Sequence, residues 1–211
     1  MKKFFLFSLI LGFAFNVNAQ ELQTIKLVEP SAKGGSTIME ALSNRKSVRG
    51  FSNKKLSDQD LADLVWATAG INRKEVGLRT APSWRNFQDV ELYVCFKEGV
   101  YLYNAKDHAL EPVMKGDFYP PIVSGQDFVN DAPVVLLLVS DFDKIKDDGS
   151  SPVYISGLNA GIMSQNISLF CSGKGMATVP RGFMDKEALK KAFNLRENQH
   201  ILLNHPVGYP K

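Results

Sequence analysis

The sequence predicts an α+β protein, because strand and helix patterns are interspersed and two of the strand patterns form an antiparallel hairpin. The hairpin covers residues 90–104, where "VELYVCF" and "GVYLYN" flank the turn "KEG". A continuous apolar run at residues 132–141 predicts a strand that is buried on both faces. Residues 150–173 predict a long helix that begins near Ser150 or Ser151. It is apolar on more than one side, as expected for a central or interface helix.

The N-terminal residues predict a secretory signal peptide. Lys2 and Lys3 form a positive region, residues 4–15 are apolar, and small residues precede Gln20, the expected first residue of the mature chain. The apolar run is too short to span a membrane. We therefore expect residues 1–19 to be removed and the protein to be periplasmic or secreted.

The mature chain, residues 20–211, has the length of a single domain. Its formal charge falls from +3 to about +1 when Lys2 and Lys3 are removed, and a nearly neutral chain argues against nucleic-acid binding. Cys95 and Cys171 both lie in apolar runs, which favours buried free thiols over a disulfide. No repeat, low-complexity run or linker suggests a second domain.

The region before the hairpin predicts a polar leader and two helices. Residues 20–36 predict a strand or loop, and residues 36–45 a short helix capped by Ser36 or Thr37. The segment 57–70 is the clearest helix of the chain. It has a serine cap, aspartates in its first turn, one apolar face and a terminal glycine.

The remaining segments complete the α+β pattern. Residues 71–88 are polar and lack apolar periodicity, which predicts a long loop of the functional or disordered kind. After the long helix, residues 176–180 predict a short strand, residues 185–193 a helix and residues 200–210 a closing strand.

Several common kinds of site lack support in the sequence. His108, His200 and His205 are scattered and have no acidic or cysteine partners at ligand spacing, so no metal site is expected. The acidic segment 141–152 lacks the ligand spacing of a calcium loop and is expected to be solvated. The "GKG" at residues 173–175 follows a helix rather than a strand, unlike a dinucleotide fingerprint. No "GxSxG" motif of a serine nucleophile occurs.

The stretch "NRKSVRGF" at residues 44–51 gathers Arg45, Lys46 and Arg49 around the hydroxyl of Ser47. Such a basic cluster is either a solvated helix end or a site for an anion. Arginine forks match the geometry of phosphate. In an extended chain, Arg45, Ser47 and Arg49 would project from the same side, where one oxygen-rich ligand could meet all three. The residues alone leave both interpretations open.

Three further stretches follow the basic cluster in order: "APSWRNFQ" at residues 81–88, "GKGMATVPRGF" at residues 173–183 and "PVGYPK" at residues 206–211. Together with the cluster they resemble the "RxSxR/K", "PSxxNxQ", "GLG…VP.GF" and terminal-strand motifs of the FMN-dependent nitroreductase superfamily. The resemblance covers nearly all of residues 36–211. It is closest to short members, which include the flavin dehydrogenases of azole-forming peptide pathways.

The resemblance implies a nitroreductase-like fold, with a mixed, mainly antiparallel sheet flanked by helices. It also implies a homodimer, with the long central helix and FMN at the dimer interface. By position, Arg45, Lys46 and Ser47 would hold the ribityl phosphate, and Arg49 would lie near the N1/C2 carbonyl edge of the flavin. A fixed cation at that edge favours the reduced ring, where negative charge collects.

Other contacts to FMN are implied by the same resemblance. Pro82, Ser83 and Asn86 would reach the flavin from the partner chain. The backbone N–H of Gly182 or of Arg181 would approach N5, the atom that accepts hydride.

Three weaker contacts and two departures from the pattern complete the comparison with the family. Gln126 is a candidate for the polar edge of the ring, and Pro180 would lie beside the N5 contact. Either Lys211 replaces the basic phosphate ligands of larger members, or the cluster holds the phosphate alone. Asn159 stands where many short relatives have the aspartate of "DAG", and Asp89 begins a "DV" where they have "PW". We expect these departures to affect substrate preference more than flavin binding.

The function implied is that of an exported FMN-dependent oxidoreductase that passes hydride or electrons through flavin N5 to an unidentified small-molecule acceptor. The cofactor performs the chemistry, so no side chain is expected to be catalytic. Nicotinamide cofactors are cytoplasmic, whereas this protein is expected to be exported. The electron donor is therefore left open between NAD(P)H and a membrane quinol or another exported carrier. A non-catalytic flavin-binding or flavin-scavenging protein needs the same contacts and is the alternative.

Overall fold

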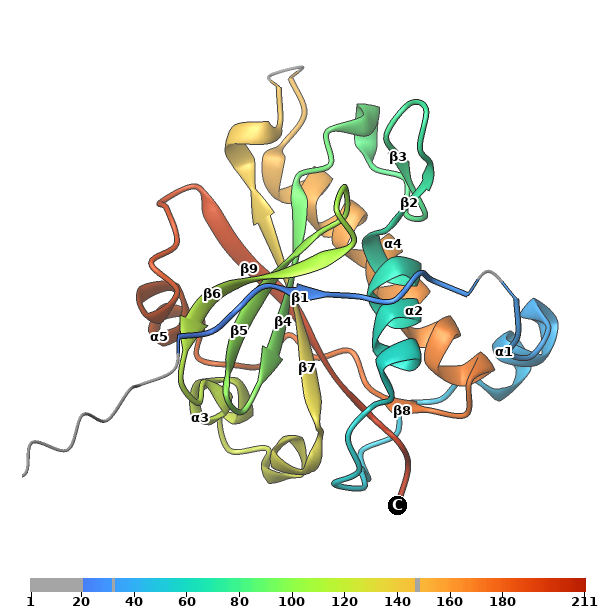
Figure 1. Cartoon of the computed structure of the whole chain (residues 1–211). Coiled ribbons are helices and arrows are strands. Elements are labelled where there is room, and N and C mark those ends of the chain that lie inside the picture. Colours follow the sequence, from blue (N-terminus) through green and yellow to red (C-terminus); the bar gives the residue numbers. More distant parts are fainter. Residues whose placement is uncertain (1–20, 32, 147–148) are drawn as a thin grey trace, which may run out of the picture.

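The structure of the chain is a computed structural model that describes residues 21–31, 33–146 and 149–211 (Figure 1). The expected signal peptide, residues 1–19, lies outside the described residues. Among the helices within those ranges, none is long and apolar enough to cross a membrane.

An antiparallel sheet forms the middle layer of the fold. In the described part of the chain it has seven strands in the order β1-β6-β5-β4-β7-β9-β8, and each neighbouring pair is antiparallel. The strands are β1 (Ile25–Lys26), β4 (Val90–Phe96), β5 (Gly99–Asn104), β6 (Ala109–Lys115), β7 (Val134–Asp141), β8 (Ala177–Thr178) and β9 (Gln199–Gly208). The expected hairpin, buried strand, short strand and closing strand are therefore confirmed.

Helices cover both faces of this sheet (Figure 1). Helices α2 (Asp58–Ala69) and α4 (Pro152–Gly173) pack on one face, whereas α3 (Tyr119–Val123) and α5 (Lys186–Ala192) pack on the other. The short helix α1 (Ile38–Asn44) packs against α4. The predicted α+β class with a mainly antiparallel sheet flanked by helices is confirmed.

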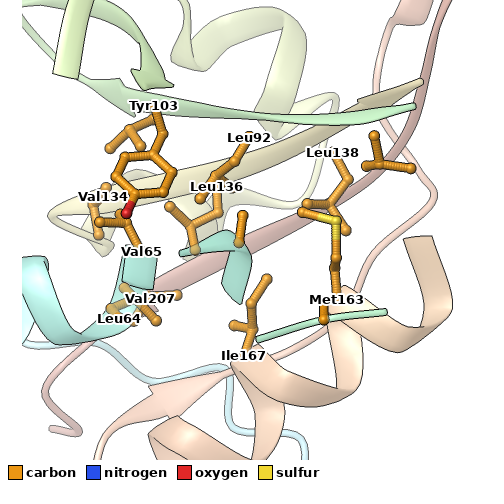
Figure 2. Packing of buried hydrophobic residues seen from close by; sticks show 14 of the residues in the cluster. Leu64, Val65, Leu92, Tyr103, Val134, Leu136, Leu138, Met163, Ile167 and Val207 are labelled. Carbon is orange, nitrogen blue, oxygen red and sulfur yellow. The ribbon is translucent and has the colours of Figure 1, made fainter. Parts of the chain in front are cut away.

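Strand β7 is buried along its whole length because it lies between the two helical layers. Val134, Leu136 and Leu138 belong to the core under α2 and α4 (Figure 2), whereas Val135 and Leu137 belong to the core on the other face. Side chains alternate between the faces of a strand with a period of two. The continuous apolar run thus reflects two buried faces, as the sequence predicts.

The two N-terminal helices begin at the expected caps. Thr37 and Glu40 form a capping box at the start of α1, in which the backbone N–H of Thr37 donates to the Glu40 carboxylate at 2.8 Å. This bond lowers the pKa of Glu40. At the start of α2, Ser57 Oγ accepts the N–H of Asp60 at 3.1 Å, and Gly70 follows the last residue of the helix.

Helix α4 is the predicted long helix and begins after Ser151. Its side toward the sheet is buried, yet Val153, Tyr154 and Leu158 are also apolar and are 70%, 64% and 41% exposed. The helix is therefore apolar on more than one side, as the sequence predicts. An exposed apolar face of this kind leaves room for a partner, although the interface itself stays a prediction.

Residues 71–88 are more ordered than the sequence predicts. Strands β2 (Ile71–Arg73) and β3 (Leu78–Arg79) form a separate antiparallel hairpin, which is followed by a 3₁₀ turn at Trp84–Asn86. Strands of two or three residues contain too little alternation to be recognised in the sequence. The prediction of one long irregular loop is therefore wrong for the first half of this segment.

Strand β6 and helix α3 were not predicted. Strand β6 extends the hairpin to a three-stranded meander, but Pro112 and the exposed Glu111 interrupt its apolar pattern. On its outer side, β6 pairs with the two residues of β1, which lie opposite Leu110 and Ala109 and not opposite Pro112. Proline is therefore tolerated at this position, as it is on an edge strand. Helix α3 has five residues, and two of them are prolines at its start.

The two cysteines are free and buried, as expected. Cys171 belongs to the core on the α2 and α4 side of the sheet, and Cys95 to the core on the other side. Burial raises the pKa of both thiols, so neither is activated as a nucleophile.

Candidate functional site

The basic cluster lies on an extended segment that links α1 to α2. The chain leaves α1 at Arg45, whose φ of −59° and ψ of 120° are extended. Arg45, Lys46, Ser47 and Arg49 are exposed, and Val48 between them is half-buried. The cluster's three cations and its serine hydroxyl make no hydrogen bond or ion pair with other described residues. Their bonding capacity is therefore available to a ligand.

The two sides of this segment face different surroundings. Lys46 and Val48 line a cavity of about 480 Å³ whose other lining residues come mainly from α4, its C-terminal turn and β8. In an extended chain, where side chains alternate, Arg45, Ser47 and Arg49 would project away from this cavity. The common side expected for these three residues stays a prediction.

The end of the chain lies beside the basic cluster. Phe51 and Pro210 form an isolated antiparallel bridge, and the backbone N–H of Lys211 donates to the Gly50 carbonyl at 3.4 Å. The Lys211 ammonium donates to Asp131 Oδ2 at 2.8 Å. Lys211 is thus close enough to assist the cluster, but its charge is already paired with a carboxylate.

The turn after β8 contains Pro180, Arg181 and Gly182. The N–H of Arg181 donates to the Asn204 carbonyl at 2.8 Å, and the N–H of Asn204 donates back to the Arg181 carbonyl at 2.8 Å. The Arg181 N–H is therefore engaged with β9, which corrects its assignment as a contact to N5. Gly182 is exposed, and its N–H makes no hydrogen bond with the described residues, so it is the donor that remains.

The Arg181 side chain is buried and bonded only to neutral acceptors. Its Nε donates to Gln126 Oε1 at 2.8 Å, and its Nη1 to Asn204 Oδ1 at 2.8 Å. The guanidinium also donates to the carbonyls of Ile122 and Val123 at the end of α3. Burial lowers the pKa of Arg181. These bonds fix Gln126, the residue expected at the polar edge of the ring, next to the turn.

The loop that joins β3 to β4 has an unusual backbone conformation. Arg85, Asn86 and Gln88 have φ values of 47°, 57° and 48°, a region that residues other than glycine seldom adopt. The N–H of Gln88 donates to Ser83 Oγ at 2.9 Å, and its Nε2 donates to Asn86 Oδ1 at 3.0 Å. Ser83 and Asn86 are thus bonded to one residue, and Pro82 lies exposed before them.

A buried polar network attaches this loop to α4. Asn159 Oδ1 accepts the N–H of Trp84 at 2.9 Å, and Asn159 Nδ2 donates to Asp89 Oδ1 at 2.6 Å. Asp89 Oδ2 accepts the hydroxyl of Ser140 at 2.8 Å. Asp89 and Asn159 are 0% and 2% exposed. In the sequence these residues are two separate departures from a motif, and only the structure brings them into contact.

The two groups of expected flavin contacts lie at different places along α4. The loop between β3 and β4 is attached at Asn159, whereas the cavity beside the cluster is lined by Cys171. Twelve residues of helix separate these positions, which is roughly 18 Å at the α-helical rise. The turn at Gly182 lies on the side of the basic cluster. It directly follows β8, and Thr178 on β8 accepts the N–H of Val48, which lies within the cluster segment.

His205 on β9 is buried behind the cluster. Its Nε2 is 2.7 Å from Ser164 Oγ on α4, and its Nδ1 is 3.2 Å from Thr178 Oγ1. Burial lowers the pKa of His205 to about 3, so the ring is neutral at physiological pH. These two partners could not be found from the sequence, because Ser164 and Thr178 lie 41 and 27 residues from His205 and form no recognisable motif with it.

Within residues 21–31, 33–146 and 149–211, no group of three or more histidine, cysteine, aspartate or glutamate side chains could hold a metal ion. The half-buried Arg79 lines a small cavity with Pro82, Ser83 and Asn159. Its Nε has no hydrogen-bond partner in the described part of the chain. Sequence reasoning missed Arg79, because it lies in the polar segment that was expected to be irregular.

Comparison with known families gives one match over most of the chain. The sequence model of the Nitroreductase family matches residues 42–209. The matched range takes in the basic cluster, the loop between β3 and β4 and the turn after β8. No curated protein sequence matches the chain.

Solved structures similar to this one include the following three. A candidate nitroreductase from Ralstonia eutropha JMP134 is 32% identical, with 89% of this chain and 90% of that chain covered and a TM-score of 0.83. A candidate NADH oxidase from Clostridium acetobutylicum is 20% identical, with 83% and 88% covered and a TM-score of 0.58. A chain of the microcin synthetase McbBCD complex from E. coli is 19% identical, with 98% and 85% covered and a TM-score of 0.69. The last two similarities concern the fold alone.

Proposed function

The chain belongs to the nitroreductase family, and we propose that it is an exported FMN-dependent oxidoreductase that acts as a homodimer. FMN, when bound, supplies hydride and electron transfer at its N5 atom. The acceptor is a small molecule that the site does not identify. The described residues contribute binding, orientation and charge, and no side chain is assigned a catalytic role.

The observation that carries this proposal is the bonding capacity left free around the basic cluster. Arg45, Ser47 and Arg49 are exposed, and none of them is paired with another described residue. In an extended chain they would share one side. Arginine forks and a hydroxyl suit the oxygens of a phosphate. The solvated helix end, the other interpretation of this cluster, would leave the match to the rest of the family pattern unexplained.

Two neutral donors near the cluster suit the flavin ring. The N–H of Gly182 and the amide nitrogen of Gln126 make no hydrogen bonds with the described residues, and Gln126 is held in place by Arg181. In the proposed site, Gly182 would approach N5 and Arg49 the N1/C2 carbonyl edge. A fixed cation at that edge stabilises the charge that collects there on reduction.

A homodimer would bring together the two groups of contacts that lie roughly 18 Å apart along α4 in one chain. Val153, Tyr154 and Leu158 expose apolar surface at the same end of α4 where Asn159 holds the loop. A partner that covers this surface could present its own Ser83 and Asn86 to the flavin of the first chain. Light scattering on the FMN-loaded protein should report a dimer, and a monomer with tightly bound FMN would refute the shared site.

The flavin assignment is tested on the purified mature protein. We expect a yellow protein with non-covalent FMN rather than FAD, identified by chromatography of the released flavin. A colourless protein that takes up no FMN on reconstitution would exclude the proposal.

A second experiment separates the oxidoreductase from a flavin-binding or flavin-scavenging protein. The FMN-loaded protein is mixed anaerobically with NADH, NADPH or a soluble quinol, and flavin bleaching is followed by stopped flow. Bleaching within seconds by at least one donor supports the oxidoreductase. Tight binding with no bleaching by any of the three supports the non-catalytic alternative.

Export is tested in cells. Fractionation should find the full-length protein in the periplasm or the medium, and removal of residues 2–19 should retain it in the cytoplasm. A full-length protein that stays cytoplasmic would contradict the assignment of the signal peptide.

A further inference from the structure

The loop between β3 and β4 needs an external contact to hold its shape. Arg85, Asn86 and Gln88 all have positive φ values, and none of them is glycine. A left-handed conformation is unfavourable for such residues and persists only where the surroundings impose it. Inside the loop, the bonds from Gln88 to Ser83 and Asn86 contribute. One bond that ties the loop backbone to α4 runs from the Trp84 N–H to Asn159 Oδ1.

That bond depends on which way the Asn159 amide points. A backbone N–H can only donate, so Trp84 requires the oxygen of the Asn159 amide and would be repelled by its nitrogen. On the other side of the amide lies Asp89, whose carboxylate can only accept. Asp89 therefore turns Asn159 Nδ2 toward itself and leaves Oδ1 for Trp84. Through Asn159, Asp89 thus determines whether the bond to the Trp84 N–H forms.

Asp89 is itself held in one position. Ser140 Oγ donates to Asp89 Oδ2 and lies 2.9 Å from Ser156 Oγ, and Ser156 bonds to the Pro152 carbonyl at the start of α4. Asp89, Ser140 and Ser156 are each 0% exposed. Hydrogen bonds are stronger away from water, and a misdirected polar group there is costly. The network therefore favours a single arrangement.

We propose that Asp89 is a positioning residue of the flavin site: through Asn159 it holds the loop in the conformation that presents Ser83 and Asn86 to the partner's flavin. The role in flavin binding rests on the proposed function. The hydrogen-bond pattern itself does not, because it is a property of the folded chain.

The pair can be exchanged without changing the pattern of donors and acceptors. With Asp89→Asn and Asn159→Asp together, the carboxylate at position 159 would accept from Trp84 N–H and from the amide at position 89. The oxygen of that amide would then accept from Ser140. Asn159→Asp alone instead brings two carboxyl groups within hydrogen-bond distance in a buried site, where they cannot both be ionised. Asp89→Asn alone keeps an acceptor for Asn159, because the Ser140 hydroxyl can turn toward Ser156.

The experiment compares these three variants with the wild type and with a matched control. The control is Asn166→Asp, the same change in the same helix, at a residue whose side-chain amide donates to the Ala67 carbonyl on α2. FMN affinity is measured by fluorescence titration, and stability by urea unfolding. The loop is followed by the emission of Trp84 in a Trp66→Phe background, because Trp66 is the other tryptophan of the chain.

We expect Asn159→Asp to raise the Kd for FMN at least about tenfold and to shift the Trp84 emission. The double variant should return the Kd to within about threefold of the wild type, with the wild-type emission. Asp89→Asn should have a small effect of a few-fold, and Asn166→Asp should leave the Kd and the emission unchanged even if it lowers stability.

Two results would overturn the inference. One is a double variant that binds FMN no better than Asn159→Asp, because the pair then does not act as a unit. The other is an Asn159→Asp variant that is destabilised but binds FMN as the wild type does, because the pair then supports folding alone. If the wild type binds no FMN, the proposed function fails. The Trp84 emission then still decides whether the exchanged pair restores the loop.

Discussion

Arg45 and Arg181 are the same kind of residue in opposite surroundings. Arg45 is exposed on an extended segment and is not paired with any other described residue. Arg181 is 5% exposed, and its guanidinium is bonded to two side-chain amides and two backbone carbonyls. The first arginine can bind a ligand and the second cannot, because its donors are already used.

The difference teaches that charge and sequence motif do not by themselves identify a binding residue. Both arginines belong to stretches that resemble family motifs. Arg45 was expected to hold the phosphate through its side chain, and Arg181, as the alternative to Gly182, to approach N5 through its backbone N–H. The structure instead gives Arg181 a supporting position, where it holds the turn that carries Gly182 and fixes Gln126 beside it. Its charge has no carboxylate partner among its bonded neighbours. Three predictions test this contrast and one tests the buried His205, in order from the largest expected effect to the smallest.

Arg181→Met should have the largest effect, on folding. The change leaves carbonyls of Ile122 and Val123 and two side-chain oxygens without donors in a buried place, so we expect a loss of about 3–5 kcal/mol. Urea unfolding of the flavin-free protein measures it. The matched control Arg45→Met should lose less than about 0.5 kcal/mol. Equal losses of unfolding free energy in the two variants would mean that the bonds of Arg181 contribute no more to stability than Arg45 does.

A second prediction concerns His205, which is buried behind the cluster and is neutral. Its pKa is lowered by burial to about 3, whereas in the unfolded chain it would be about 6.5. Between these values the unfolded state binds more protons, so stability falls as the pH falls, by about 1.4 kcal/mol per pH unit for this group. Above pH 6.5 its contribution is constant.

The matched variant is His205→Gln, which cannot titrate. Unfolding free energies of both proteins are measured from pH 7 to pH 4. We expect the wild type to lose more stability with acid than the variant does, with the difference growing toward low pH. Parallel curves would mean that His205 is not buried in its neutral form.

Arg45→Ala should weaken FMN binding without destabilising the protein. Hydrogen bonds to charged groups contribute about 1.5–3 kcal/mol, so the Kd should rise by roughly one to two decades. Any flavin that is retained should keep nearly the same reduction potential. Lys186→Ala, which removes one exposed charge from α5 on the other face of the sheet, is the control and should bind FMN normally. If Arg45→Ala binds FMN as tightly as the control does, the cluster is a solvated surface.

Arg49→Ala should have the smallest effect on binding but a distinct effect on reduction. Without the cation at the N1/C2 carbonyl edge, the reduced ring loses stabilisation, so the potential should become more negative. A shift of about 30 mV corresponds to about 1.4 kcal/mol for a two-electron couple. Anaerobic redox titration measures it. A variant that loses FMN as Arg45→Ala does, with no change of potential, would make Arg49 a phosphate ligand only.

Much of the fold could be predicted because its elements are long and patterned. Strand β7 and helix α4 are 8 and 22 residues long and rich in apolar residues. The caps of α1 and α2, Thr37 and Ser57, can be recognised from the local sequence. The hairpin of β2 and β3, strand β6 and helix α3 were missed. Each is short, or carries proline, so its conformation depends on neighbours rather than on its own pattern.

The residues of the candidate site also fall into two groups, those that could be identified from the sequence and those that could not. The basic cluster could be found from its sequence because its residues are consecutive and act through exposed side chains. The contact between Asp89 and Asn159 could not be found, although both residues had been noticed as departures from a motif. Seventy residues separate them, and they meet only because β4 and α4 pack together.

The sequence by itself determined the α+β class, the resemblance to the nitroreductase family and the position of the basic cluster. These depend on periodicity, capping residues and runs of adjacent charges, which are local properties of the chain. The tertiary structure decided which of those charges stay free, that the Arg181 N–H is used by Asn204, and that Asp89 directs Asn159. Such outcomes depend on burial and on which donors meet which acceptors. Both are fixed only when distant segments pack against each other.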